Sequence, residues 1–144
     1  MAIIQSFRDL EAWQAAMDLS VCIYSVSGLL PPEERFGLAS QMRRASVSVP
    51  SNIAEGQSHG SDGRYIAHVR IAIGSLGELS TELELAQRLK FLTAADLSDV
   101  ERQLVSTRRL LFGLLRSLRK KRLSRAASKP RTTGQPTADQ PTAD

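Results

Sequence analysis

The sequence predicts an all-α protein built from four helices. Leu, Ala, Ser, Arg and Glu dominate its composition, aromatic residues are scarce, and no stretch shows the sustained two-residue alternation of a β-strand. Apolar residues instead recur at spacings of three and four over long stretches, which Gly- and Pro-containing connectors separate. At 144 residues, the chain is long enough to bury a core within one domain.

The first helix is predicted to follow a capping-box-like start, in which Ser6 precedes Asp9 by three residues. It is expected to end near Gly28, and Pro31 and Pro32 mark a short connector before the next helix. Its inward stripe is predicted from apolar residues at helical spacing, which are Leu10, Trp13, Met17, Val21 and Tyr24.

The second helix is predicted from about Glu33 to Gly56 and has two apolar faces. Its core face is predicted to hold Leu38, Met42, Ala45, Val49 and Ile53. Val47, Pro50 and Ala54 lie on nearly the opposite side and predict a second packing partner, for which another copy of the chain is one candidate. A kink is expected at Pro50, because proline removes a helical hydrogen bond and its ring opposes the carbonyl of Ser46.

The third helix is predicted from about Arg64 to Lys90, after a connector that spans Gly56 to Gly63. It is expected to pack through Ile66, Val69, Ile73, Leu76, Leu79, Leu83, Ala86 and Leu89. The small residues Gly74, Ser75, Gly77 and Ser80 lie in its middle, where glycine weakens a helix. They predict the close approach of another backbone.

The fourth helix is predicted to start at a capping box formed by Thr93 and Asp96. Its nearly unbroken heptad consists of Leu97, Val100, Leu104, Thr107, Leu111, Leu114 and Leu118. The neighbours Leu110, Phe112 and Leu115 are expected to widen this apolar seam. The bundle is therefore predicted to span residues 1–119.

Positive charge is concentrated at the end of the chain. Met1 to Leu115 holds 11 Lys and Arg against 13 Asp and Glu, whereas Arg116 to Asp144 holds 8 against 2. Residues 120–144 form a predicted tail that is first basic and then rich in Pro and Thr, with a tandem repeat from Gln135 to Asp144. Because the tail has few apolar residues, disorder is expected after about Arg125.

Three segments resemble one bacterial family. They are FRDLEAW at Phe7 to Trp13, GLASQMRRASVSVPSNIAEG at Gly37 to Gly56, and IAIGSLGELSTELELA at Ile71 to Ala86. They resemble the proteins encoded in intervening sequences of 23S rRNA genes, whose wider family includes the accessory variability protein of diversity-generating retroelements. The resemblance implies an antiparallel up-down-up-down bundle assembled as a homopentameric ring, without catalytic activity. For the retroelement relatives it implies RNA or DNA binding and contact with a reverse transcriptase.

Catalytic and metal chemistry is not expected from the sequence. The di-metal site of four-helix bundles requires Glu-x-x-His pairs, and neither His59 nor His68 has an acid three residues before it. His59 is interpreted as a solvated loop residue and His68 as a partly buried polar residue. Cys22, which lies between Val21 and Ile23, is interpreted as an inert small hydrophobe. No catalytic residue, metal ligand or cofactor is therefore predicted.

Two groups of cations are candidates for phosphate contact. The stronger group lies at the end of the chain and can follow a phosphate backbone without selecting bases. It comprises Arg116, Arg119, Lys120, Lys121, Arg122, Arg125, Lys129 and Arg131. The weaker group comprises Arg43, Arg44, Arg64 and Arg70. For Arg43 and Arg44 a structural role is favoured, in which they pair with Glu55, with acids on the third helix or with a neighbouring copy.

The leading hypothesis is a non-enzymatic homo-oligomer that binds RNA or DNA through its basic surface and tail. The alternatives are an interaction scaffold, such as a reverse-transcriptase accessory subunit, and a purely structural oligomer. Cys22 is the single cysteine, so a reducing cytoplasm is expected. No apolar run approaches the roughly 20 residues of a membrane span, and neither a signal peptide nor a membrane partner is expected.

Overall fold

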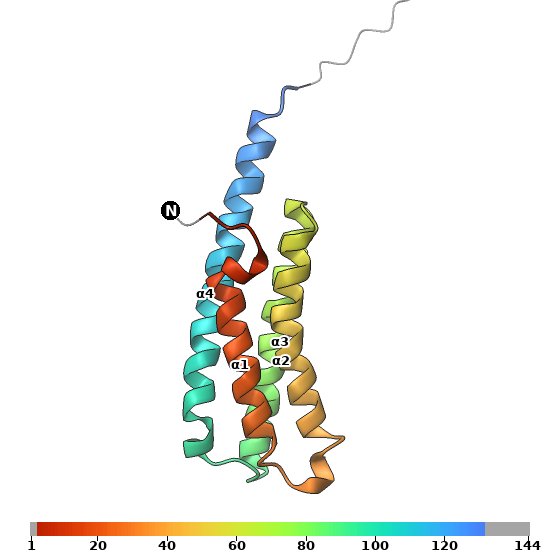
Figure 1. The fold of residues 1–144 in the computed structure, drawn as a ribbon, viewed down its shortest axis with the longest axis vertical. Helices are drawn as coiled ribbons and strands as arrows, with labels where there is room; N and C mark the ends of the chain where they lie inside the picture. The colour runs from red at the N-terminus through yellow and green to blue at the C-terminus, as the bar shows by residue number, and fades with distance from the viewer. Residues whose placement is uncertain (1–2, 132–144) are drawn as a thin grey trace, which may run out of the picture.

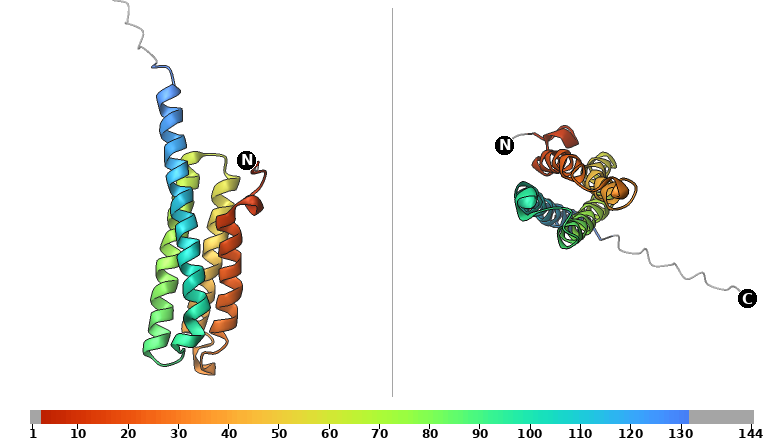
Figure 2. Two further views of the ribbon diagram at one scale, coloured as in Figure 1. Left: turned by 90° about the vertical axis from the view of Figure 1, so that its left-hand side faces the viewer. Right: turned by 90° about the horizontal axis from the view of Figure 1, so that it is seen from below.

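A computed structural model of the chain describes residues 3–131 and shows four long helices. They are α1 (Glu11–Ser27), α2 (Leu38–Ser58), α3 (Asp62–Arg88) and α4 (Ala94–Ser128), with short 3-10 turns at Phe7–Asp9 and Pro32–Glu34. Successive helices run in opposite directions, as Figure 1 shows. Each helix packs against two neighbours, and α1 closes the arrangement by contacting α4, which gives the four-cornered section seen from below in Figure 2. The predicted all-α four-helix architecture is confirmed.

Both predicted capping boxes are present. Thr93 and Asp96 exchange backbone-to-side-chain hydrogen bonds of 2.8 and 3.2 Å at the start of α4. The Ser6 and Asp9 box caps the short turn Phe7–Asp9 rather than α1, which begins two residues later at Glu11. The carboxylate of each box accepts backbone N–H bonds, and these bonds lower the pKa of Asp9 and of Asp96.

The predicted inward stripe of α1 is only partly correct, because Leu10 is buried and Trp13 packs against the core, but the other three residues do not. Met17, Val21 and Tyr24 are exposed, whereas the buried side of the helix consists of Ala12, Ala16, Leu19, Ser20, Ile23, Val26 and Ser27. The helix carries two apolar stripes, and the stripe that includes the small residues Ala12, Ala16 and Ser20 faces the core. Small residues allow close helix contact, and the Ser20 hydroxyl lies 2.9 Å from a backbone carbonyl of α2.

The predicted core faces of the other helices are largely correct. All five predicted residues of α2 are buried, and so are most of those on α3 and α4. Leu89 and Phe112 are the clear exceptions, because 49% and 43% of their surfaces are exposed. On α4, Leu115 is buried while Leu114 is only partly covered.

The outer apolar face of α2 differs from its prediction. Val47 is exposed and Ala54 is half-buried, but Pro50 is buried within the single chain. Pro50 therefore contributes to the chain's own core and does not await a partner copy. α2 continues through Pro50, and the Ser46 carbonyl that proline leaves free accepts from the Ser20 hydroxyl of α1 at 2.9 Å. The same hydroxyl lies 3.0 Å from the Ala16 carbonyl of its own helix, so its proton is shared between two acceptors.

Close backbone approach occurs at Gly56 rather than at Gly74 and Gly77. A Cβ atom at Gly74 or Gly77 would meet nothing within 4 Å, so within the described chain no close contact occurs at these two glycines. Ser75 between them is buried, and its hydroxyl lies 2.8 Å from that of Ser48 on α2. A Cβ atom at Gly56 would lie 2.8 Å from the Tyr65 ring and 2.9 Å from the Cβ of His68. This glycine belongs to α2 and allows α2 and α3 to converge at their connection.

α4 continues across residues 119 and 120 without interruption and ends at Ser128, three residues beyond the point after which disorder is predicted. The predicted Pro- and Thr-rich tail and its tandem repeat fall within residues 132–144, which lie outside the described residues. None of the described helices is both long enough and apolar enough to cross a membrane.

Candidate nucleic-acid interface

The end of α4 projects beyond the other three helices (Figures 1 and 2). Leu118 is its last buried residue, and every residue from Arg119 to Arg131 is exposed. This segment therefore lacks the apolar packing that holds the rest of α4 in the bundle. Its surface is formed by side chains that face solvent.

One sign of charge dominates α4 from its third turn onward. Every charged residue from Arg102 to Arg131 is lysine or arginine. The predicted cations Arg116, Arg119, Lys120, Lys121, Arg122 and Arg125 all lie on the helix and are exposed. Lys129 and Arg131 follow directly after its end and are also exposed.

The sequence prediction missed three further cations of the same helix, Arg102, Arg108 and Arg109, which lie within the bundle region. Arg102, Arg109, Arg116 and Lys120 fall within about 40° of one another at 100° per residue. They therefore share the outer side of α4, opposite its leucine seam. No acid follows Glu101 in the described chain, and this pattern in the sequence indicates that the three arginines belong to one cationic surface.

The projecting segment is tethered to α3. Arg125 Nη1 lies 2.6 Å from Oδ2 of Asp62, the first residue of α3, whose side chain is only 14% exposed. The Arg122 guanidinium passes near the backbone of Gly63, 3.9 Å from where a Cβ would stand. Among residues 3–131, no acid pairs with Arg116, Arg119, Lys120, Lys121 or Arg122.

Arg43 and Arg44 lie apart from this segment, near the beginning of α2. Ser58 ends α2 about 15 residues further on, which corresponds to roughly 20 Å along the axis. Arg43 Nε donates to Ser27 Oγ at 2.8 Å, and its guanidinium lies 5.3 Å from the centre of the Tyr24 ring. Within the described chain neither arginine pairs with an acid, so the predicted pairing with Glu55 or α3 is wrong there.

Arg64 and Arg70 lie on α3, and Arg70 is exposed. Arg64 follows Asp62 and Gly63 directly, so it lies at the end of the bundle that Arg122 and Arg125 contact. Arg70 lies almost two turns further along α3. Of the weaker group of predicted cations, Arg64 is therefore the one that the fold brings to the projecting segment.

An apolar hollow between α3 and α4 borders the cationic helix. It has a volume of about 900 Å³, and its lining includes Leu83, Arg108, Arg109 and Phe112. The Phe112 ring was predicted to widen the buried seam, but it is exposed between Arg109 and Arg116. It places one aromatic side chain among the cations of α4, where none had been expected.

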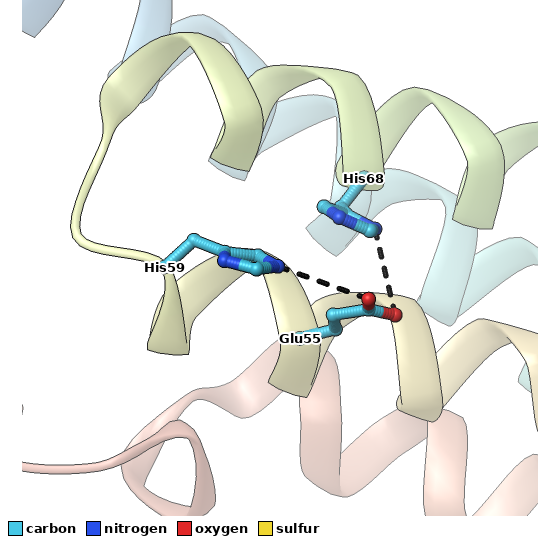
Figure 3. A group of neighbouring side chains, drawn as sticks. All are labelled: Glu55, His59 and His68. Atoms are coloured by element: carbon cyan, nitrogen blue, oxygen red, sulfur yellow. Dashed lines mark ion pairs between the residues drawn. The ribbon is translucent and has the colours of Figure 1, made fainter.

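Two histidines and a glutamate meet where α2 joins α3, which the sequence did not predict. His59 Nε2 lies 3.8 Å from Glu55 Oε1, and His68 Nδ1 lies 3.9 Å from Glu55 Oε2 (Figure 3). The two imidazole rings stack, with centroids 5.4 Å apart and an interplanar angle of 16°. His59 lies exposed in the turn after α2, as expected, and it also contacts Glu55 and His68.

Cys22 is half-buried, and burial together with the nearby Asp99 carboxylate raises the pKa of its thiol. A raised pKa lowers the thiolate fraction, which agrees with its interpretation as an unreactive side chain. Burial likewise raises the pKa of Tyr65 to about 12. Neither residue is activated for nucleophilic or acid-base chemistry at neutral pH.

The fold and its charged surface define an all-α antiparallel four-helix bundle with one long cationic helix. The family model described as 23S rRNA-intervening sequence protein matches residues 8–113. The chain belongs to this family, as the sequence resemblance implied.

A crystal structure at 1.70 Å resolution, of a protein of unknown function from the S23 ribosomal protein family of Bacteroides thetaiotaomicron VPI-5482, has a similar fold. The TM-score is 0.67 at 21% sequence identity, and the match covers 72% of this chain and 97% of the other. Among curated proteins, none matches the chain. The similarity to the solved structure therefore supports the fold alone.

Proposed function

We propose that the protein is a non-enzymatic nucleic-acid-binding subunit whose main ligand is RNA. The observation that carries this proposal is the uninterrupted positive charge of α4, where every charged residue from Arg102 to Arg131 is Lys or Arg. The family name, which refers to rRNA genes, supports RNA over other polyanions.

The geometry of α4 suits contact with a phosphate backbone. The four cations on its outer side, from Arg102 to Lys120, span roughly 27 Å at 1.5 Å per residue. Flexible exposed side chains over such a length can follow several successive phosphates, while base-specific contacts are few. Phe112 offers one ring on which an unpaired base can stack.

The proposal includes assembly into a homo-oligomer, with the ring of five subunits that the family resemblance implies. Exposed apolar side chains on the side formed by α1 and α2, which include Tyr24, Phe36 and Val47, support a subunit interface there. Several copies of α4 on one particle would bind one RNA molecule with an avidity above that of a single helix.

A second candidate function is an accessory subunit of a nucleic-acid enzyme such as a reverse transcriptase. The hollow beside α4 favours it, because apolar and cationic side chains are neighbours there and can hold protein and nucleic acid together. In that case the isolated protein binds RNA weakly, and full affinity requires the partner.

The test is RNA binding as a function of salt concentration. The variant Arg116→Gln/Arg119→Gln/Lys120→Gln/Lys121→Gln removes four charges of α4 and keeps good helix formers. We expect its log–log salt slope to fall by roughly 0.7–0.9 for each phosphate that the variant no longer neutralises, and its affinity to drop at least tenfold at low salt. Fluorescence anisotropy with single-stranded RNA, duplex RNA and duplex DNA measures both quantities.

The matched control is Arg35→Gln/Arg43→Gln/Arg44→Gln/Arg70→Gln, which removes the same charge from exposed or half-buried positions away from the projecting end of α4. This variant is expected to retain most of the affinity. Wild-type affinity in the α4 variant would refute the role of α4, and a larger loss in the control would move the interface to α2 and α3.

A further inference from the structure

We propose that Glu55, His59 and His68 form a binding site for a divalent transition-metal ion of the Zn²⁺ class. One possible ligand atom from each side chain lies within 4.8 Å of the other two. Two imidazole nitrogens and one carboxylate oxygen are a ligand set that Zn²⁺ accepts, with at least one coordination position left for water. Figure 3 shows the three side chains turned toward one another from α2 and α3.

The distances fit an ion after small side-chain rotations. Metal–ligand bonds of 2.0–2.1 Å place tetrahedral ligand atoms about 3.3 Å apart. The His59 nitrogen and the nearer Glu55 oxygen are 3.8 Å apart in the absence of an ion. The side chains of Glu55 and His59 are 59% and 36% exposed, so both can turn toward the ion without disturbing the core.

Placement of the ligands follows from the helices. Glu55 and His59 are four residues apart and so share one face at the end of α2. His68 faces them from α3, which comes close because Gly56 has no side chain to keep it away. The site therefore joins two helices across the short connection between them.

A hydrogen-bond chain behind His68 supports the same conclusion. The Asn52 amide nitrogen donates to the carbonyl and hydroxyl of Ser48 at 2.8 and 3.1 Å, which fixes the orientation of the amide. The Asn52 oxygen therefore accepts from Nδ1–H of His68, at 3.0 Å. This bond leaves the lone pair of Nε2 available, as in metal sites where the second ring nitrogen donates to an oxygen. Because Nδ1 is the ring nitrogen that lies 3.9 Å from Glu55, the exposed Glu55 carboxylate has to rotate to share an ion with Nε2.

The Ser48 hydroxyl is itself held, since it lies 2.8 Å from the hydroxyl of Ser75 on α3. His68 is thus positioned by three polar residues from α2 and α3, while its own side chain is 19% exposed. A purely structural histidine needs the Asn52 bond alone. The additional convergence of Glu55 and His59 beside the ring is what a metal ion accounts for.

The test uses the full chain without a histidine tag, with Zn²⁺ and Co²⁺ as probes. Zn²⁺ affinity is measured by competition with a chromogenic chelator, and thermal unfolding is followed with and without the metal. We expect one site per chain and a metal-dependent rise in the melting temperature. Each of His59→Gln and His68→Gln is expected to weaken binding at least tenfold, and Asn52→Ala about tenfold through loss of ligand orientation.

The control variants are Glu84→Gln, which alters another exposed acid, and Cys22→Ser, which removes the thiol; both are expected to bind Zn²⁺ as the wild type does. Circular dichroism without metal checks that every variant folds, and His59→Gln, at an exposed position, carries the test if His68→Gln does not fold. Unchanged affinity in folded His59→Gln, or loss of binding in Cys22→Ser, would overturn the proposal.

Discussion

Glu82 is a buried carboxyl group on α3 for which no hydrogen-bond partner is present among the described residues. Burial, together with the neighbouring charge of Glu78, raises its pKa from an ordinary 4.5 to about 7. Between these two pH values the folded protein holds a proton that the unfolded chain has already released. Folding stability from this group is therefore greatest at low pH and is lost as the pH rises through about 7.

We expect Glu82→Gln to remove this pH dependence. The free energy of unfolding of the variant at pH 8 should exceed that of the wild type by about 1–2 kcal/mol, after allowance for partial solvation of the site. Below pH 4.5, where the wild-type carboxyl is protonated in both states, the difference should nearly vanish. Urea unfolding at several pH values measures this difference in the free energy of unfolding. Glu101→Gln, at an exposed position, is the control, and equal pH profiles for wild type and Glu82→Gln would contradict the assignment.

Residue types and spacing predicted part of the candidate site. The cations of α4 from Arg116 onward were identified from the sequence because a run of one charge needs no tertiary information. The cluster of Glu55, His59 and His68 was missed because its members come from two helices, and the Glu-x-x-His spacing was the wrong pattern to search. Their meeting depends on the close approach at Gly56, which spacing along one helix does not reveal.

At the scale of the helix, α2 shows how a proline is accommodated within the core. Pro50 has no N–H for the carbonyl of Ser46, and the Ser20 hydroxyl of α1 lies 2.9 Å from that oxygen. Ser20 and Ser46 are both buried, so water has little access to the carbonyl. A hydrogen bond between two helices thus replaces one within a helix.

We expect Ser20→Ala to reduce the free energy of unfolding by about 1–2 kcal/mol, because a buried carbonyl loses its donor. In a Pro50→Ala background the restored N–H can serve Ser46, so the same change should cost less, and the double-mutant cycle should show coupling. Chemical denaturation measures all four proteins. Ser80→Ala is the control, since the Ser80 hydroxyl donates only to the carbonyl four residues earlier in its own helix. Equal costs of Ser20→Ala in both backgrounds would contradict this role.

The helices themselves were predictable because their apolar spacing and capping residues are local. The inward side of α1 was not, since Met17, Val21 and Tyr24 form an apolar stripe as regular as the buried one. The choice between the two stripes depends on how closely α2 approaches, and Ala16 and Ser20 permit that approach. The prediction placed the stripe with the larger side chains in the core, whereas the fold buries the stripe whose small residues let α2 approach.

At the scale of the whole molecule, the stripe of α1 that the core leaves exposed adjoins Phe36 and Val47. Tyr24, Phe36 and Val47 border a surface hollow of about 620 Å³. Phe36 is 87% exposed, which is unusual for a large aromatic side chain on an isolated subunit. These positions support the proposed subunit interface. Tyr24 and Phe36 join Val47 there in place of Pro50, which the sequence had predicted as an interface residue.

We expect the wild-type protein to scatter light as an oligomer, and Val47→Glu to dissociate it because burying a carboxylate in an interface is costly. Val105→Glu is the matched control, since Val105 is an exposed valine on α4. Multi-angle scattering after size-exclusion chromatography measures both. A wild-type mass equal to the single chain at 15.8 kDa would contradict the assembly, and dissociation by Val105→Glu alone would move the interface to α4.

The projecting end of α4 has an energetic consequence beyond the display of charge. After Leu118 the helix has no apolar packing, and an isolated helix of about ten residues is marginal in water. The like charges of Arg119 and Arg122, three residues apart, and of Arg116 and Lys120, four apart, repel one another and oppose the helical state further. A bound polyanion would neutralise that repulsion, so helix formation in this segment and ligand binding are linked equilibria. The stiffness of α4 beyond the bundle therefore depends on whether a polyanion is bound.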